Sequence, residues 1–385
     1  MSSTCVGGSI SGDLRGTPML IAAILAAAAL GGCGSSSPDP PWISCGEVIE
    51  PAGSAEPFYI YLSPDGNDEN SGSETAPVAT LRRAQEILLD ARPASDVLVR
   101  IRGDRGPFEG QSVVWEYSNA EHHTTLESYP DSTRASFREG GADTTFFVLK
   151  AAAGRQTNLH FKRISVEGYA SGAIWFLGSA GEESGWNGSN TISDCVFREI
   201  GNGARPGRHF SWAVIDLVNS RRNVIDDCAF IDCANANTGD FPQDTIPPDT
   251  TSAGPLPIVA VYLAHHSGCN YIAGCSFERV KGDAIRIRDD SNDNEICHNY
   301  FLQSGWTALC TTWSFYPSPP WAAGAECPSW HNSFHDNRSQ GNWLCGEPRL
   351  FYDMSSAPRS GCPRPPGRYM YQMKMWANES GPCAE

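Results

Sequence analysis

The chain has 385 residues, 40% of them hydrophobic, and it contains 38 glycines and 27 prolines. This composition suits short strands joined by turns and provides ample apolar material for a core. The formal net charge of −16 at pH 7 excludes a general nucleic-acid binder, which needs a basic face.

Residues 1–33 have the features of a targeting segment. Their apolar stretch, 18–30, is too short to span a bilayer. It ends in Leu-Gly-Gly-Cys at Cys33, which resembles a bacterial lipoprotein signal. The resemblance implies lipidation of Cys33, export, and a place at the outer membrane, with the lipid as the only membrane contact. An ordinary secretory signal is the alternative. Residues 34–57, rich in Ser and Pro at their start, are interpreted as a linker.

The first folded elements follow this linker. A strand is predicted over 58–62, then a turn-rich segment. Thr80 can cap a short helix whose Leu81, Ala84 and Leu88 share one face. Further strands are predicted at 97–101, near 112–117 and at 124–129.

From about residue 158 to 342 a motif recurs: an apolar residue, two positions, Cys or Asn, one position, then Phe. The copies are NTISDCVF, NVIDDCAF, NYIAGCSF, NEICHNYF and, more weakly, NSFHDNRS. A second short strand follows at 173–176, 214–217, 260–263, 284–287 and 308–311. Two strand signals per repeat describe one coil of a solenoid, which buries its apolar face only by stacking on a neighbour.

The repeat also predicts the environment of several cysteines. Cys195, Cys228 and Cys275 share one repeat position, so we interpret them as a ladder of small buried side chains. Asn299 and Asn337 continue this column and predict an amide ladder.

Other cysteines flank loops and are candidates for disulfides, although pairing cannot be deduced from sequence alone. The candidates are Cys310 with Cys327 and Cys345 with Cys362. Zinc is not expected, because no Cys/His cluster with ligand spacing is present along the chain.

Three segments carry a family resemblance. YIYLSPDGNDENSGSETAPVATLRRA, VLVRIRGDRGPFEGQSV and HTTLESYPDSTRASFREGG resemble the first segment and first coils of the pectate-lyase-like superfamily of right-handed parallel β-helix proteins. The resemblance implies an all-β right-handed parallel β-helix over 58–345, closed at its open end by the short N-terminal helix. We expect an irregular C-terminal cap over 346–385 and a monomer. Because this superfamily holds lyases, glycosidases, epimerases and non-catalytic surface proteins, the resemblance leaves the activity open.

Strand alternation predicts which side chains point outward from the second strand of each coil. The predicted outer column is Trp175, Asp216, Tyr262, Arg286 and Cys310. Such an exposed stripe suits a sugar-binding groove, because aromatic faces stack on sugars and Arg binds carboxylates or hydroxyls. Insertions at 234–257 and 313–330 could wall this groove. We therefore predict a polysaccharide partner. The alternative is that these side chains form an ordinary solvent-exposed surface.

The predicted groove supplies candidates for substrate binding, catalysis and metal binding. Its substrate-binding candidates are Trp175, Tyr262, His265 and His266, and its catalytic candidates are Arg286, Arg288, Lys281 and Asp216. A lyase acting on uronic acids has to neutralise the carboxylate and remove the proton next to it. The resemblance implies that an Arg or Lys takes part in this chemistry, in some members together with Ca²⁺. Asp289, Asp290 and Asp293 are the candidate Ca²⁺ ligands.

Three activities stay open. The preferred one is β-elimination by an exported polysaccharide lyase. A glycosidase would need two carboxylates, here Asp216 with Asp283 or Asp289. In a non-catalytic glycan-binding or scaffold protein, Arg286 and Arg288 would instead pair with the neighbouring aspartates.

Overall fold

The computed structural model describes residues 45, 56–139, 145–150, 156–179, 183–201, 213–234, 258–305, 308–314, 326–341, 350–355, 362 and 373–381. The chain divides into Met1–Ser44 and Cys45–Glu385, and every described residue belongs to the second unit. The predicted signal with Cys33, and nearly all of the predicted linker, therefore lie outside the described residues. Within the described part, no helix has the length and apolar content needed to cross a membrane.

The described chain winds through three sheets in turn, and every strand pair in them is parallel. The ten-stranded sheet comprises β1 (Phe58–Leu62), β2 (Val97–Arg102), β5 (Thr124–Tyr129), β8 (Leu159–Lys162), β12 (Thr191–Ser193), β16 (Val224–Asp226), β19 (Tyr271–Ala273), β22 (Glu295–Cys297), β25 (Ser333–His335) and β28 (Lys374–Trp376). The nine-stranded sheet comprises β3 (Phe108–Glu109), β6 (Ala135–Arg138), β9 (Ile164–Glu167), β13 (Val196–Arg198), β17 (Ala229–Ile231), β20 (Ser276–Glu278), β23 (Tyr300–Leu302), β26 (Arg338–Gln340) and β29 (Glu379–Ser380). The eight-stranded sheet comprises β4 (Val113–Trp115), β7 (Thr145–Leu149), β10 (Gly172–Leu177), β14 (Ala213–Val218), β18 (Val259–Ala264), β21 (Ile285–Arg288), β24 (Cys310–Ser314) and β27 (Phe351–Ser355).

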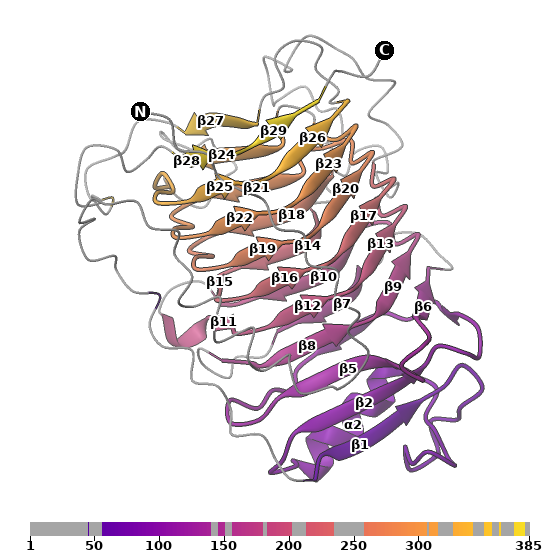
Figure 1. The fold of residues 1–385 in the computed structure, drawn as a ribbon. Helices are drawn as coiled ribbons and strands as arrows, with labels where there is room; N and C mark the ends of the chain where they lie inside the picture. The colour runs from indigo at the N-terminus through magenta and orange to yellow at the C-terminus, as the bar shows by residue number, and fades with distance from the viewer. Residues whose placement is uncertain are drawn as a thin grey trace, which may run out of the picture. The chain divides into compact units, whose positions relative to one another are not determined.

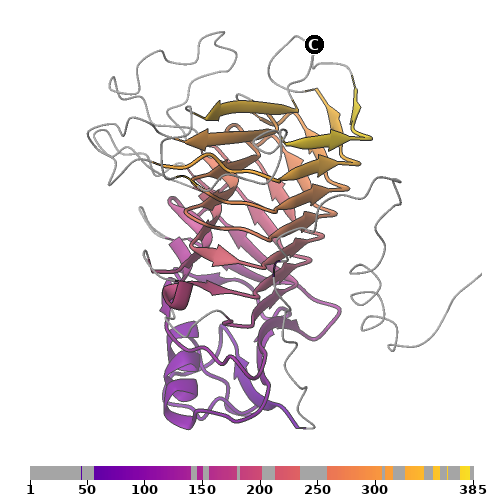
Figure 2. The same cartoon turned by 90° about the vertical axis from the view of Figure 1, so that its left-hand side faces the viewer.

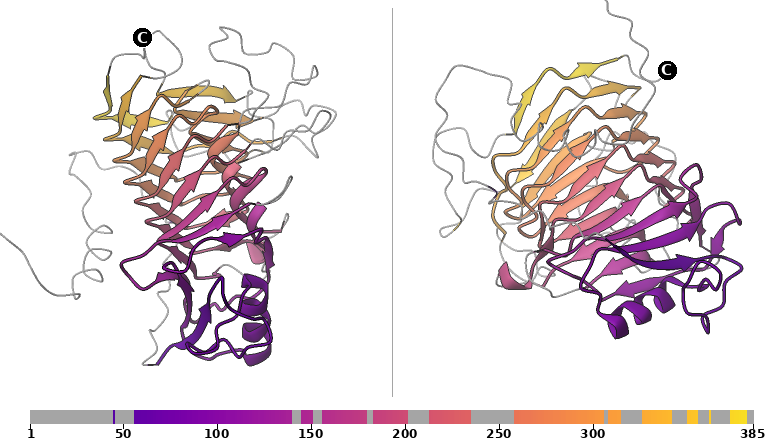
Figure 3. Two further views of the ribbon diagram at one scale, coloured as in Figure 1. Left: turned by 90° about the vertical axis from the view of Figure 1, so that its right-hand side faces the viewer. Right: turned by 60° about the horizontal axis from the view of Figure 1, so that its bottom comes forward.

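One coil takes one strand from each sheet, and successive coils stack in chain order (Figure 1). The predicted right-handed parallel β-helix is thus confirmed. A short pair, β11 (Asn187–Gly188) with β15 (Ser220–Arg221), and the 3₁₀ turn η1 (Glu183–Gly185) decorate the corners. Figure 2 and Figure 3 show the same stack of coils from other sides.

The predicted N-terminal helix is α2 (Leu81–Ala91), which lies at the β1 end of the stack (Figure 1). The hydroxyl of Thr80 accepts a hydrogen bond from the backbone N–H of Arg83 at 3.1 Å, which caps the first turn. Leu81, Ala84 and Leu88 are buried on the face that contacts β1 and β4. The helix therefore covers apolar surface that the first coil would otherwise leave open.

The core is built from ladders of like residues, because each repeat position lies above the same position in the next coil. Cys195, Cys228 and Cys275 are free and buried, as predicted. Their neighbouring phenylalanines stack as well: the rings of Phe230 and Phe277 lie 4.8 Å apart at an interplanar angle of 2°. The predicted amide ladder is also confirmed, since Asn299 Nδ2 donates to Asn337 Oδ1 at 3.1 Å.

A second amide ladder was not predicted. The asparagine that begins each repeat is buried, and its Nδ2 donates to Oδ1 of the asparagine one coil further on. The ladder runs through Asn190, Asn223, Asn270, Asn294 and Asn332. Each Oδ1 also accepts the backbone N–H of the previous asparagine, so these amides satisfy the corner backbone as well as one another.

The predicted disulfides are wrong. Cys327 pairs with Cys362, and Cys45 pairs with Cys269, whereas Cys310 is a free buried thiol in the core. Spacing along the chain could not reveal these pairs, because each joins segments that only the coiling brings together.

The parallel strands extend further toward the C-terminus than predicted. β27, β28 and β29 add one strand to each of the three sheets. Part of the region expected to be an irregular cap over 346–385 therefore repeats the coil geometry.

Candidate functional site

The outer column of the eight-stranded sheet has the register predicted from the repeats over four coils. Trp175 lies beside Asp216, Asp216 beside Tyr262, and Tyr262 beside Arg286 on adjacent parallel strands. At β24 the prediction is wrong by one residue: Thr311, not Cys310, lies beside Arg286. Cys310 lies beside Ile285 and points into the core.

This column is covered, whereas the sequence predicted an exposed stripe. Asp216 and Tyr262 are each only 6% exposed. Tyr262 packs in a second apolar cluster, outside the main core, with Ala213, Val259, Ala264 and the partly buried Val218. The column therefore forms a buried polar site rather than an open groove. The two insertions expected to wall it lie largely outside the described residues.

Asp216 has a buried polar atom that lacks a hydrogen-bond partner. Its Oδ1 is buried and has no hydrogen-bond partner among the described residues. Burial raises the pKa of Asp216 from 3.8 to about 7, against the opposing influence of His265 and Arg288. A carboxyl group with this pKa is partly ionised at neutral pH and can either accept or donate a proton.

Arg288 links Tyr262 to a carboxylate that the sequence did not point to. Nη1 of Arg288 donates to the Tyr262 hydroxyl oxygen at 2.9 Å. Nε lies 2.9 Å from both carboxylate oxygens of Glu326, and Nη2 completes a bidentate ion pair with the same side chain. Glu326 precedes Cys327, whose disulfide to Cys362 holds this segment. The ion pair raises the pKa of Arg288 in spite of its burial, so Arg288 stays a cation.

Arg286 is held in a separate ion pair. Its Nε and Nη2 contact Oδ2 of Asp283 at 2.9 and 2.6 Å, and Thr311 donates to the same oxygen at 2.8 Å. The guanidinium carbon lies 4.9 Å from the ring centre of Trp313, a cation–π contact. Asp283, a predicted glycosidase carboxylate, is fully buried by these partners. Both arginines thus have fixed carboxylate partners, the arrangement expected of a non-catalytic face.

The predicted histidines and metal ligands form paired contacts at the strand ends. His265 Nδ1 lies 2.7 Å from Asp289 Oδ2, and His266 Nδ1 lies 3.1 Å from Asp290 Oδ2. The hydrogen bond to Asp290 raises the pKa of His266. Asp293 instead contacts a third histidine, His331. Among the described residues, the three aspartates do not form a group whose ligand atoms lie within 4.8 Å of one another.

The remaining predicted residues lie at the margin of the site. The indole Nε1 of Trp175 donates to the carbonyl of Ala213 at 3.0 Å, which fixes this ring against β14. Lys281 lies in the turn before β21, and among the described residues no hydrogen bond or ion pair joins its side chain to Asp216 or Arg288. Its predicted catalytic role is therefore the least supported of the four.

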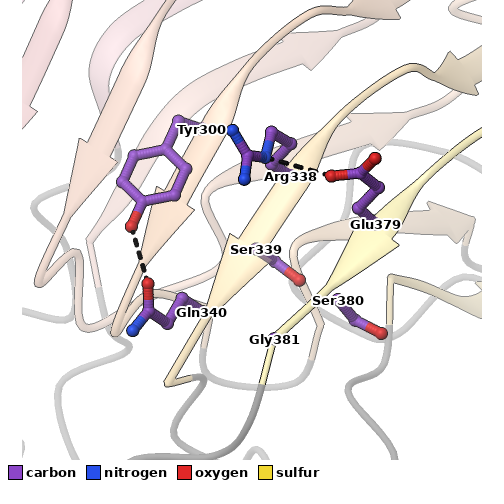
Figure 4. Close-up of a pocket in the computed structure, with 7 residues that line it drawn as sticks. All are labelled: Tyr300, Arg338, Ser339, Gln340, Glu379, Ser380 and Gly381. Carbon is purple, nitrogen blue, oxygen red and sulfur yellow. Dashed lines mark hydrogen bonds and ion pairs between the residues drawn. The ribbon is translucent and has the colours of Figure 1, made fainter.

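A shallow pocket lies on another sheet and does not include these residues. It has a volume of about 270 Å³ and is formed at the outer face of β23, β26 and β29 (Figure 4). Its polar groups pair with one another: Arg338 with Glu379 at 3.1 Å, and Tyr300 with Gln340 at 3.1 Å. The exposed polar side chains of the pocket thus satisfy one another, whereas the buried hydroxyl of Ser339, which also lines it, has no hydrogen-bond partner among the described residues.

Comparison with known proteins gives likeness of fold. The chain matches no family model and no curated protein sequence. Solved structures similar to it include a pectate lyase (12% identity, TM-score 0.45, covering 86% of this chain and 78% of that one). A lacto-N-biosidase from Eubacterium ramulus is similar at 14% identity and a TM-score of 0.41, covering 84% of this chain and 68% of that one. A rhamnogalacturonan lyase is similar at 14% identity and a TM-score of 0.38, covering 78% of this chain and 66% of that one. Likeness at this level carries no argument about activity. On its own strand topology, the chain is a right-handed parallel β-helix protein, as the resemblance to the pectate-lyase-like superfamily predicted.

Proposed function

We propose that this protein is a polysaccharide lyase that cleaves a uronic-acid-containing glycan by β-elimination. The observation that carries the proposal is Asp216: a buried carboxyl with an unpartnered oxygen and a pKa of about 7, beside Tyr262 and the cation Arg288. No other carboxylate of this face combines these properties, as far as the described residues reach.

The three side chains divide the reaction between them. Ionised Asp216 takes the proton from the carbon next to the uronate carboxylate. The electrons of that C–H bond form the new C=C bond, and the bond to the leaving sugar oxygen breaks. Arg288 provides positive charge where the carboxylate gains electron density. Tyr262 accepts a hydrogen bond from Arg288 through its oxygen, so its own proton can pass to the leaving oxygen. Since Asp216 and Tyr262 are buried, substrate binding has to uncover them.

Hydrolysis is less well supported, because a glycosidase needs two carboxyl groups that are available to the substrate and to water. Glu326 is bound by Arg288, Asp283 by Arg286 and Thr311, and Asp289 by His265 and the backbone N–H of Cys327. This leaves Asp216 without a second, unengaged carboxylate on the described part of the face.

The test is the ultraviolet absorbance of the unsaturated uronate produced by elimination. Wild type, Asp216→Asn and the control Asp90→Asn, on the exposed side of α2, are incubated with a panel of polyuronates, with and without Ca²⁺. The expected result is product formation that rises with pH through about 7, is lost in Asp216→Asn and is kept in the control. Equal rates in wild type and Asp216→Asn would refute the assignment of Asp216 as the catalytic base.

A second candidate function is supported by the two arginine ion pairs. With Arg286 held by Asp283 and Arg288 by Glu326, the face resembles a rigid structural lattice more than a reactive site. We therefore retain a non-catalytic glycan-binding role. The non-catalytic role predicts that polyuronate embedded in a native gel slows the migration of the wild-type protein, while no elimination product forms.

We also propose that the protein is exported. Two disulfides support this proposal, because disulfides persist in oxidising compartments and are rare in the cytosol. Lipidation at Cys33 and an outer-membrane location stay part of the proposal. Labelling with a radioactive fatty acid, compared between wild type and Cys33→Ser, tests the lipid anchor.

A further inference from the structure

The outer face of the ten-stranded sheet carries a cluster of potential metal ligands on β22 and β25. Glu295 and Cys297 point to the same side of β22, because Ile296 between them points into the core. His335 lies beside Cys297 on the adjacent strand. One ligand atom from each of these three side chains lies within 4.8 Å of the other two. We propose that Glu295, Cys297 and His335 bind a divalent zinc-class metal ion.

The donor set suits such an ion. Zinc is held by thiolate sulfur at about 2.3 Å and by imidazole nitrogen or carboxylate oxygen at about 2.0–2.2 Å. In a tetrahedral site these bond lengths place the ligand atoms about 3.3–3.8 Å apart. The Nε2 atom of His335 and Oε1 of Glu295 already lie 3.2 Å apart, and since all three ligand atoms lie within 4.8 Å of one another, side-chain rotations can complete the geometry.

The surroundings of His335 present its Nε2 to the cluster. Nε2 lies 3.2 Å from Oε1 of Glu295, whereas Nδ1 contacts Oδ2 of Asp336 at 2.7 Å. A metal-ligating histidine commonly donates its other N–H to a carboxylate in this way, which fixes the tautomer and the ring orientation. The ring of Trp376 stacks on His335 at 4.0 Å and 8°, which holds the imidazole plane. Asp336 and Trp376 are thus positioning residues for the proposed ligand.

The negative charge around the cluster also fits a bound cation, which displaces the thiol proton of Cys297 when it binds. Cys297 and His335 are buried, whereas the Glu295 side chain is 50% exposed, so the site opens toward solvent on one side. The Glu295 and Asp336 carboxylates supply negative charge that a divalent ion neutralises. Three protein ligands leave a fourth position for water or another small ligand. A second group of three potential ligands among the described residues, Cys45, Cys269 and Asp293, is unsuitable because its two cysteines form a disulfide.

The proposal departs from the sequence-based expectation that zinc is absent. That expectation rested on the lack of a close CxxC motif or a Cys/His cluster with ligand spacing along the chain. The coil brings His335 beside Cys297 although 38 positions separate them in the chain. Spacing rules for zinc motifs do not detect ligands contributed by successive coils.

Metal binding is tested on the full-length protein, purified without a histidine tag and with its disulfides intact. The probes are Zn²⁺, measured by mass spectrometry after gel filtration, and Co²⁺, followed by the sulfur-to-cobalt charge-transfer absorbance. We expect one zinc ion per chain and a charge-transfer band that Cys297→Ser abolishes. Asp336→Asn should keep the band and weaken the affinity about 10–100-fold. Asp90→Asn is the control, because it makes the same Asp-to-Asn exchange at an exposed position of α2, at the β1 end of the stack.

Two outcomes would overturn the proposal. One is wild-type protein that retains no zinc and gives no charge-transfer band with Co²⁺. The other is Cys297→Ser or His335→Gln binding zinc as tightly as wild type. Circular dichroism checks that each variant is folded; if Cys297→Ser does not fold, the affinity of Asp336→Asn relative to Asp90→Asn decides. None of these readouts depends on the lyase assay, so the two proposals fail separately.

Discussion

Replacing Asp216 by Asn is expected to stabilise the protein, by an amount that grows as the pH rises above about 4. The folded protein raises the pKa of Asp216 from 3.8 to about 7 because the carboxyl is buried with an unpartnered oxygen. One pKa unit corresponds to about 1.4 kcal/mol, so ionised Asp216 destabilises the fold by about 4 kcal/mol. Asn fills the same space without a charge and removes this cost.

The sign of the pH dependence follows from proton linkage. Below about pH 4 the carboxyl is protonated in both folded and unfolded chains, and it contributes no pH dependence. Between about pH 4 and 7 the folded chain keeps a proton that the unfolded chain has lost, so wild-type stability falls by about 1.4 kcal/mol per pH unit. Above pH 7 the effect is complete. The difference between variant and wild type should therefore grow from near zero at pH 4 to about 4 kcal/mol at pH 8.

The assay is equilibrium urea unfolding of wild type, Asp216→Asn and the control Asp90→Asn at pH 4, 6 and 8. Comparing variants at each pH removes the contributions of the other titrating groups. A stability difference that is the same at all three pH values, or a variant less stable than wild type at pH 8, would refute the reasoning. A stability gain together with loss of elimination activity is the combination expected of a functional group held in an unfavourable environment.

Three further changes test other contacts. Glu326→Gln leaves Arg288 buried beside a neutral partner and should destabilise by about 3–5 kcal/mol, measured by urea unfolding; a change below 1 kcal/mol would show that the pair is solvated. Asn270→Ala removes the acceptor for two N–H groups of the preceding coil and should cost about 3 kcal/mol, whereas Asn270→Asp should retain part of this stability if the acceptor is what matters. Gly188→Ala places a Cβ 2.0 Å from the carbonyl oxygen of Arg221 and should lower the thermal unfolding midpoint; an unchanged midpoint would mean that the corner relaxes without strain.

The fold was predictable because the sequence contains a recognisable repeat for each coil. An apolar residue, a cysteine and a phenylalanine at fixed spacing specify both strands of a corner and the residues that stack between coils. The register of the outer column followed from the same alternation as far as Arg286. It failed at β24 because the inward positions there are Cys310 and Thr312, which are less apolar than the neighbouring Leu309 that the pattern placed inward.

The site was only partly predictable. Trp175, Asp216, Tyr262 and Arg286 were found because they share one strand position. Glu326 was not, because it reaches Arg288 from a separate segment of the chain and not through a strand register. The burial of Asp216 was also missed, because alternation tells which face a side chain points to but not whether that face is covered.

The Cys45–Cys269 disulfide changes how the protein would respond to a pulling force. It joins residues 224 positions apart, so tension on the chain before Cys45 passes directly to the coil that contains β18 and β19. The coils from β1 to β17 lie inside the covalent loop and bear none of this load. A solenoid pulled from its terminal strand would peel open one coil at a time, since each coil is held by its neighbours alone. Here the force enters the stack at an interior coil, which neighbouring coils hold on both sides.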